Sequence, residues 1–338
     1  MSAAWINEPK AHPLEVKAAP TYTPGPNEIL VRNHVVAMNP IDNTTQIRGI
    51  FPLQYPAIMG QDVAGEVVAI GPNVTRFKDG DRVLGHSVVF ATQEQRDGAF
   101  QTYTIVRTNL ACPIPDEISF ESASVLPLGL STASCALFQD DDLHLQLPTS
   151  PSQKPTGKTV LIWGAASSVG CNAVQLAVAA GYEVVATASP HNFDLVKKLG
   201  ASQVLDYHNP AVVEELLHAL QGRELAGAFD CIGFSAAQAT ATVVAASQGA
   251  KRVVSTKPVP ADLNRLEGVT VKQCRGDALR DNHIGKAVYE DFLPQALKDR
   301  SFVPAPGPLV AGKGLESVQG ALDLLQKGVS AKKVVVVL

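Results

Sequence analysis

The sequence predicts an α/β protein in which a β-rich domain is followed by a doubly wound parallel sheet. Three observations support this prediction: the chain length, the turn-rich strand pattern of the first third, and the strand–helix alternation that follows it. The 338 residues exceed what one hydrophobic core usually supports, so at least two domains are expected.

Short apolar or alternating runs fill the first 110 or so residues, and turn signals separate them. The runs are Glu28–Val36, Ala64–Ile70, Arg82–Leu84 and Thr102–Val106. The turn signals include Pro24–Pro26, Gly71–Asn73 and Lys78–Gly80. Many short strands with turns between them favour a barrel-like all-β domain.

The later part alternates strand and helix patterns, which is typical of βαβ units and a parallel sheet. Strands are predicted at Thr159–Trp163, Glu183–Thr187, Gln203–Leu205, Ala228–Ile232, Arg252–Ser255 and Val269–Gln273. Helices are predicted at Val169–Ala180, His191–Leu199, Val212–Leu220, Ile284–Lys298 and Leu315–Lys327, before a terminal strand at Lys333–Leu338. Phe120–Phe138 has a helical composition broken by Pro127 and Gly129, and Gln139–Lys158 is expected to be an exposed loop.

Composition narrows the function classes. Hydrophobic residues make up 46% and charged residues 18%, and the net charge is −4 with no basic block, which argues against nucleic-acid binding. No secretion signal or membrane-spanning run is recognised, so no membrane partner and a cytoplasmic location are expected. The five scattered cysteines never show metal-ligand or disulfide-framework spacing and are expected to be reduced thiols.

A turn of small residues follows the first strand of the alternating region. Gly164, Ser167 and Gly170 fall in this turn, and Ser168 and Val169 open the next helix. Such a turn lets the backbone approach a diphosphate, while the helix N-terminus offers free N–H groups. This context predicts a dinucleotide site, with an ordinary tight turn as the alternative.

The end of the second strand indicates which dinucleotide is bound. Proteins that bind NAD place an Asp or Glu there. This chain instead has Ser189 and Asn192, with no carboxylate between Thr187 and Asn192. These polar side chains can donate to a 2′-phosphate, and Tyr207 and Lys333 are further candidates, so NADPH is predicted. The alternative is that Ser189 or Asn192 only caps the next helix.

These features resemble the medium-chain dehydrogenase/reductase family. Gly60–Gly71 resembles its GHExxGxVxxVG signature, Lys78–Val83 its GDRV turn, and Gly328–Val335 its ending. The resemblance implies a GroES-like catalytic domain over residues 1–130, a Rossmann NADPH-binding domain over 131–299, and a return to the catalytic domain over 300–338.

A narrower resemblance is to fungal zinc-free enoyl reductases, including those that act in trans on polyketide synthases. The matching stretches are Asn39–Asp42, Leu126–Ala133, Ser189–Leu195 and Asp230–Ile232. It implies that Ser189, Asn192 and Tyr207 contact the 2′-phosphate, that Ser167, Ser168 and Val169 line the diphosphate, and that Thr132 contacts the nicotinamide carboxamide.

The resemblance also bears on the chemistry. Asn39 and Gln61 stand where zinc-dependent relatives carry ligands, so no metal is expected. Without a Lewis acid, reduction of a conjugated alkene is favoured over oxidation of an alcohol. In that reduction, hydrogen-bond donors can stabilise the negative charge that develops on the carbonyl oxygen. Thr44 stands where relatives commonly have a lysine, which leaves water, Thr44 or Gln61 through solvent as proton sources.

The sequence therefore predicts NADPH-dependent reduction of a 2-enoyl or enone substrate, either free or carrier-tethered, by a monomer or homodimer. The alternatives are a zinc-free quinone or carbonyl reductase, and an auxiliary biosynthetic protein that keeps the fold without hydride transfer. Asp42 is expected to be a structural acceptor and Asp62 to brace the turn of Gln61. The three aspartates from Asp140 to Asp142 are expected to form a solvated loop.

Overall fold

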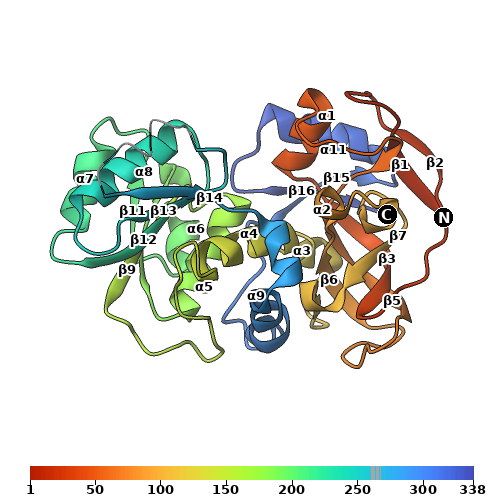
Figure 1. Cartoon of the computed structure of the whole chain (residues 1–338), viewed down its shortest axis with the longest axis horizontal. Helices are drawn as coiled ribbons and strands as arrows, with labels where there is room; N and C mark the ends of the chain where they lie inside the picture. Colours follow the sequence, from red (N-terminus) through yellow and green to blue (C-terminus); the bar gives the residue numbers. More distant parts are fainter. Residues whose placement is uncertain (260–262, 264–265, 267) are drawn as a thin grey trace. The chain divides into compact units, whose positions relative to one another are not determined.

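The computed structural model describes residues 1–259, 263, 266 and 268–338, which form two compact units. The β-rich unit comprises Met1–Leu128 and Arg280–Leu338, and the parallel-sheet unit comprises Gly129–Leu279. In Figure 1 the β-rich unit is coloured red to yellow and then blue, whereas the parallel-sheet unit runs from yellow-green to light blue. The chain thus returns to the first unit at Arg280, earlier than the expected residue 300.

Antiparallel strands build most of the β-rich unit. Its larger sheet has the order β15-β16-β3-β5-β6-β8, and β7 also pairs with β3. These strands are β3 (Glu28–Ala37), β5 (Asp62–Ile70), β6 (Arg82–His86), β7 (Tyr103–Arg107), β8 (Ala111–Pro113), β15 (Pro308–Lys313) and β16 (Lys333–Val337). A smaller sheet joins β2 (Glu15–Ala18), β1 (Ser2–Ile6) and β4 (Ala57–Ile58).

Short helices connect these strands. They are α1 (Pro40–Arg48), α2 (Val89–Thr92), α3 (Phe120–Ala123) and α11 (Ser317–Lys327), with 3-10 turns at Gln95–Asp97 and Thr108–Leu110. The inward faces of the strands and of α11 share one apolar core, which includes Val36, Val63, Val318 and Val336. The predicted β-rich domain is confirmed.

The early return to this unit has a packing cause. The expected helix Ile284–Lys298 consists of α9 (His283–Lys286), a π-helical segment at Ala287–Phe292 and α10 (Leu293–Lys298). Within the π-helical segment, the Tyr289 hydroxyl donates to the carbonyl oxygen of Pro127 at 2.8 Å, and Glu290 pairs with Arg76 at 3.2 Å. Both partners belong to the β-rich unit, so this segment packs there rather than on the parallel sheet.

Six parallel strands form the sheet of the second unit, in the order β11-β10-β9-β12-β13-β14. They are β9 (Lys158–Trp163), β10 (Glu183–Ala188), β11 (Gln203–Asp206), β12 (Glu224–Asp230), β13 (Arg252–Ser255) and β14 (Thr270–Gln273). This is the Rossmann order, whose direction reverses between the first and fourth strands. Ligands bind such sheets beyond the carboxyl ends of the strands at that reversal, which here lies between β9 and β12.

Helices cross between the strands as the alternation predicts. They are α5 (Ser168–Ala179), α6 (Phe193–Lys198), α7 (Val212–Ala219) and α8 (Ser235–Ala246), with a 3-10 turn at Pro190–Asn192. The helix α4 (Pro127–Phe138) precedes the first strand, and a further 3-10 turn at Gly276–Asp281 follows the last one. Side chains of α7 and α8 share an apolar cluster with Leu161, Val185 and Val253 of the sheet. None of the helices in the described part of the chain is long and apolar enough to cross a membrane. All five cysteines are unpaired and buried.

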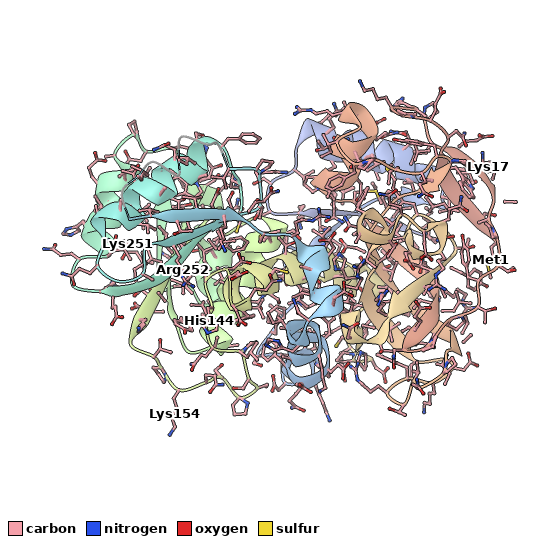
Figure 2. The ribbon with its side chains drawn as sticks, viewed as in Figure 1. Met1, Lys17, His144, Lys154, Lys251 and Arg252 are labelled. Carbon is pink, nitrogen blue, oxygen red and sulfur yellow. The ribbon has the colours of Figure 1, made fainter. Side chains whose placement is uncertain are left out.

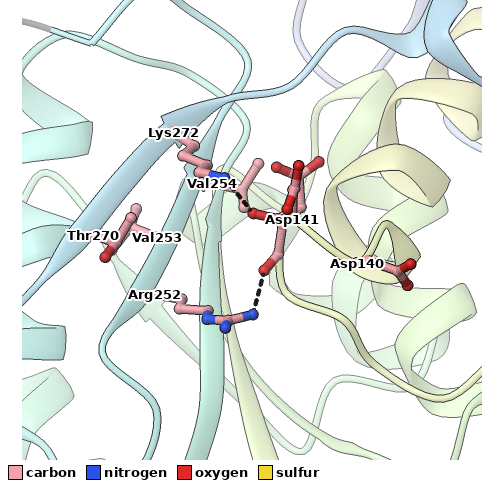
Figure 3. A pocket seen from close by; sticks show the side chains of 8 residues that line it. Asp140, Asp141, Arg252, Val253, Val254, Thr270 and Lys272 are labelled. Carbon is pink, nitrogen blue, oxygen red and sulfur yellow. Dashed lines mark hydrogen bonds between the residues drawn. The ribbon is translucent and has the colours of Figure 1, made fainter.

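The loop after α4 is less exposed than predicted. Leu143 and Leu145 are buried, and Asp142 is only 7% exposed. Asp140–Asp142 and the starts of β13 and β14 line a pocket of about 150 Å³ (Figure 3). There Arg252 donates to the Asp142 carbonyl oxygen at 3.1 Å and Lys272 to that of Asp141 at 2.8 Å.

The same pocket holds a carboxyl group with a raised pKa, and it lies away from the turn that follows β9. Burial raises the pKa of Asp142 to about 6, against the opposing effect of the Lys272 charge. Figure 2 shows Arg252 in the strand region of the parallel-sheet unit, where it begins β13. Because Arg252 and Thr270 are the first residues of their strands, this pocket lies at the amino edge of the sheet, opposite the turn that leaves β9.

Candidate cofactor site and active site

The turn after β9 is built for close approach to a ligand. Gly164 has φ +79°, and its N–H donates to the Thr187 hydroxyl at 3.0 Å. A Cβ added to Gly170 would come within 2.4 Å of the Gly164 carbonyl oxygen. The predicted strand–turn–helix geometry is therefore present, and glycine is required at both ends of the turn.

Ser167 caps the helix that follows this turn. Its Oγ accepts the Gly170 N–H at 3.0 Å, so the hydroxyl stabilises the first turn of α5. Ser168 and Val169 supply the first two N–H groups of the helix, for which an α-helix has no internal acceptors. Those N–H groups and the positive end of the helix dipole suit a diphosphate.

Thr132 lies on α4, which contacts the start of α5 at Gly129. A Cβ on Gly129 would fall 2.8 Å from Ser168 Oγ and from Asn172 Nδ2, so α4 and α5 are in direct contact there. Thr132 is three residues further along and therefore lies on the same face of α4. The backbone of Gly276 also approaches it, because a Cβ there would be 2.7 Å from Thr132 Oγ1.

At the end of β10 two hydroxyl groups meet. Ser189 Oγ and the Tyr207 hydroxyl lie 2.9 Å apart, although the residues are 18 positions apart in the chain. The Tyr207 side chain is 40% exposed, and its ring lies against that of His208 with centroids 4.0 Å apart. Neither Ser189 nor Asn192 makes a side-chain capping bond, contrary to the alternative interpretation of these residues. The geometry suits recognition of an anionic group outside β10.

A second polar cluster lies in the β-rich unit, where β3 ends between β5 and β16. The Lys333 ammonium donates to Asn39 Oδ1 at 2.5 Å and lies 2.8 Å from Asp62 Oδ2. Asn39 Nδ2 donates to the same Asp62 oxygen at 2.9 Å, and Asp62 Oδ1 accepts the Leu128 N–H at 2.6 Å. An ammonium on one side and a carboxylate on the other allow only one orientation of the Asn39 amide.

Lys333 was expected to be a further cofactor-binding candidate, and the structure places it in this cluster. The Lys333 side chain is only 4% exposed, and its partners belong to the β-rich unit, whereas Ser189 and Tyr207 belong to the other unit. The ammonium is therefore held by Asp62 and Asn39. Asp62, expected only to brace its own turn, is the centre of the cluster.

Asp42 lies in the first turn of α1 and is completely buried. Its Oδ2 accepts the Asn39 N–H at 2.9 Å, which agrees with the predicted structural role. Burial raises the pKa of Asp42 to about 7, and the nearby Asp62 carboxylate adds to the rise. The Asn39 and Gly60 N–H groups and the Lys333 charge oppose that rise.

Gln61 and His86 form a contact that the sequence did not reveal. Gln61 Oε1 and His86 Nε2 are 3.3 Å apart, and both residues are buried. The signal lies in the strand register: β5 pairs with β6 so that Asp62 faces His86, which places Gln61 beside the same histidine.

The Thr44 hydroxyl is engaged within its own helix. Its Oγ1 donates to the Pro40 carbonyl oxygen, four residues earlier, at 2.6 Å. A hydroxyl that donates to the preceding turn has used its only proton. Thr44 is thus held in a geometry that does not favour proton donation to a substrate.

The comparisons with known proteins cover both units. Residues 25–116 match the alcohol dehydrogenase GroES-like domain, and residues 168–281 match the zinc-binding dehydrogenase family. The zinc-binding alcohol dehydrogenase domain-containing protein cipB of Emericella nidulans is 56% identical over 335 residues, which are 99% of this chain and 97% of the relative. The trans-enoyl reductase himH of Aspergillus japonicus is 41% identical over 336 residues, 99% of this chain and 96% of that protein.

Solved structures agree with the fold. The crystal structure of the CurK enoyl reductase superposes with a TM-score of 0.77 at 20% identity, covering 99% of this chain and 98% of that one. At this identity the match supports the architecture alone. The predicted GroES-like and Rossmann fold is confirmed.

The zinc named in one of these family descriptions does not fit the residues in the cluster of Asn39. Both ends of the Asn39 amide are already bonded, and the Lys333 ammonium lies against Asp62, where its charge would repel a divalent cation. Gln61 supplies only an amide, which is a poor zinc ligand. In the part of the chain that the structure describes, no group of three or more His, Cys, Asp or Glu side chains could hold a metal.

Proposed function

This chain belongs to the medium-chain dehydrogenase/reductase family, and we propose that it catalyses NADPH-dependent reduction of an activated carbon–carbon double bond. It is an oxidoreductase with enoyl reductases among its relatives. The proposed substrate is a 2-enoyl or enone compound, free or tethered to a carrier protein. The observation that carries the cofactor choice is the Ser189–Tyr207 hydroxyl pair at the end of β10, where no carboxylate stands.

The residues that would hold the cofactor come from one sheet edge. The Gly164 turn and the N–H groups of Ser168 and Val169 would bind the diphosphate. Ser189, Tyr207 and Asn192 would bind the 2′-phosphate, to which a carboxylate at the end of β10 would be repulsive. Thr132 would accept or donate a hydrogen bond at the carboxamide. When bound, NADPH supplies a hydride.

The protein must also stabilise the negative charge that develops on the substrate and provide for protonation of the α carbon. Reduction of a conjugated alkene leaves negative charge on the carbonyl oxygen, which hydrogen-bond donors stabilise. Gln61 is the proposed donor, because its Nε2 is buried without a hydrogen-bond partner among the described residues. Asn39 is proposed to support the site indirectly, since its amide is held between Lys333 and Asp62. Because the Thr44 hydroxyl donates to the Pro40 carbonyl oxygen, we propose that water supplies the proton added at the α carbon.

The name of himH, a trans-enoyl reductase 41% identical over 99% of this chain, supports the proposed reaction class. A quinone or carbonyl reductase would use the same cofactor residues. The substrate panel must therefore include activated alkenes, quinones and carbonyl compounds. We would titrate the purified protein with NADPH and NADH by fluorescence, then follow NADPH oxidation in stopped flow with enoyl thioesters, enones, quinones and ketones.

The variants S189A and Y207F provide the matched test of the cofactor. Each removes one hydroxyl of the pair and should weaken NADPH binding about tenfold while leaving NADH binding unchanged, since only NADPH carries the 2′-phosphate. The control is S202A. The hydroxyl of Ser202 donates to the Val184 carbonyl oxygen at 2.9 Å, elsewhere in the same unit. Equal affinity of the wild-type protein for both cofactors would refute the NADPH assignment. Tight binding without turnover of any substrate would favour an auxiliary protein.

A further inference from the structure

The backbone on both sides of Gln61 is fixed by its neighbours. Gly60 has φ +91°, and a Cβ added there would lie 2.4 Å from the Phe100 ring, so the chain packs tightly on that ring. The Gln61 carbonyl oxygen accepts the Ser87 N–H at 2.8 Å, and Gln61 is only 3% exposed. The backbone therefore carries this side chain at a fixed place, and the remaining variable is the orientation of its terminal amide.

The two ends of the Gln61 amide lie in different surroundings. Its Oε1 is 3.3 Å from His86 Nε2, and His86 is 1% exposed. Its Nε2 is buried with no hydrogen-bond partner among the described residues. The Asn39 amide differs, because its two ends are bonded to Lys333 and to Asp62. Since a buried N–H is costly to leave unpaired, the Nε2 end of Gln61 is the end that a bound substrate would satisfy.

A terminal amide can turn over, which exchanges the places of its oxygen and its nitrogen. With Nε2 towards the substrate, Gln61 donates to the carbonyl oxygen on which negative charge develops. With Oε1 in that place instead, two oxygen atoms would face each other, and the developing charge would be destabilised. Reduction of the double bond therefore benefits from one orientation of Gln61 and is hindered by the other.

The imidazole of His86 selects between these orientations. A neutral imidazole carries one N–H, on either Nδ1 or Nε2, and the other nitrogen is an acceptor. With the proton on Nε2, His86 donates to Gln61 Oε1 and holds Nε2 of the amide on the opposite side. With the proton on Nδ1 alone, Nε2 of the imidazole is an acceptor and favours the reversed amide. The protonated nitrogen of His86 thus determines which end of Gln61 meets the substrate.

We propose that His86 is a positioning residue for the reduction, whose Nε2–H donates to Gln61 Oε1 and thereby presents Gln61 Nε2 to the carbonyl oxygen of the substrate. This inference rests on the proposed function, because it takes Gln61 as the donor to that oxygen. In this role His86 touches neither substrate nor cofactor and acts through Gln61 alone. Substitutions at the two residues should therefore have effects that do not add.

A double-mutant cycle tests this coupling. Stopped-flow rates of enoyl thioester reduction would be measured for wild type, Q61L, H86L and Q61L/H86L, with the NADPH Kd of each variant. We expect Q61L to lower the rate about a hundredfold, H86L to lower it about tenfold, and the double variant to match Q61L, with every Kd within about twofold of wild type. A double variant about tenfold slower than Q61L would overturn the proposal, because a merely structural loss acts independently of Gln61.

Two further variants separate positioning from general damage to the fold. H86Q places an amide nitrogen the same number of bonds from the backbone as His86 Nε2, so its N–H should restore the rate to within about threefold of wild type. An H86Q rate as low as that of H86L would contradict the proposal. The control is T104V, which removes another buried donor of the same unit. The Thr104 hydroxyl donates to the Gly98 carbonyl oxygen at 2.9 Å, and its loss should change the rate less than about twofold.

The protonated nitrogen of His86 can be identified without turnover. Nitrogen NMR spectra of protein labelled at its histidines distinguish a protonated from an unprotonated imidazole nitrogen. The spectrum of H86Q identifies the signals of His86 among those of the eight histidines. We expect His86 Nε2 to carry a proton, and an unprotonated Nε2 would overturn the inference even in an active enzyme. Absence of turnover by wild type would instead overturn the proposed function, together with the role of His86 in it.

Discussion

Lys333 and Asp62 form an ion pair of 2.8 Å between the first residues of two strands, and their side chains are 4% and 0% exposed. Strand β3 lies between these two strands and ends just before Asn39, whose amide bridges the charges. The pair is enclosed by hydrogen bonds from Asn39 and Leu128, so neither charge depends on solvent.

Removing one member of this pair should be costly. K333M leaves the buried Asp62 carboxylate without its cation, and breaking a buried pair in this way costs about 3–5 kcal/mol. The double variant K333M/D62N removes both charges and should recover much of that loss. Urea unfolding of wild type, K333M and the double variant measures the difference. A single variant as stable as wild type would show that the pair contributes little.

Asp42 should make stability depend on pH. Its pKa is about 7 in the folded protein against an ordinary value of 3.8, so the folded state holds the proton more tightly than the unfolded chain does. The contribution of Asp42 is therefore most favourable below about pH 4 and is lost as the pH rises towards 7. D42N keeps a neutral acceptor, so its unfolding free energy should increase relative to wild type from pH 4 to pH 8.

The control for this experiment is D116N, at a side chain that is 96% exposed. Its difference from wild type should stay nearly constant over the same pH range. A D42N curve parallel to that of wild type would mean that Asp42 is ionised in the folded protein at all these pH values.

Thr44 should prove dispensable as a proton donor. Because its hydroxyl donates to the Pro40 carbonyl oxygen, T44V should change the rate of enoyl thioester reduction by less than about twofold. T44K introduces a cation that can reach beyond the helix turn, and we expect it to reduce enoyl thioesters faster with unchanged NADPH affinity. Stopped-flow rates decide both points. A large loss in T44V would give Thr44 a direct part in the chemistry.

Gly164 should tolerate no side chain, for two separable reasons. Its φ of +79° disfavours any L-residue, and an added Cβ would meet Ile232 at 2.5 Å. Gly157 has a similar φ of +74° with nothing within 4 Å of the added Cβ. G157A should therefore cost only about 1–2 kcal/mol of backbone strain. G164A should cost more and also weaken NADPH binding, and equal melting temperatures for the two variants would contradict this.

Much of the parallel-sheet unit could be read from the sequence. The apolar run Thr159–Trp163, the small residues from Gly164 to Gly170 and the helix that follows are signals carried by neighbouring residues. The strand–helix alternation is also local, and right-handed crossovers leave few sheet orders open. Sequence alone therefore determined the fold class, the small-residue turn after β9 and the absence of a carboxylate at the end of β10.

Tertiary structure decided the rest. Lys333 and Asn39 are 294 residues apart, and only the return of β16 to the edge of β3 brings the ammonium to the Asn39 amide and to Asp62. Likewise, the Tyr289 hydroxyl donates to Pro127, which lies 162 residues earlier in the chain. This contact lies within the β-rich unit, to which the chain returns at Arg280. A lone lysine or tyrosine in a sequence says nothing of its partner, because the free energy of a buried contact depends on which distant strand or helix packs against it.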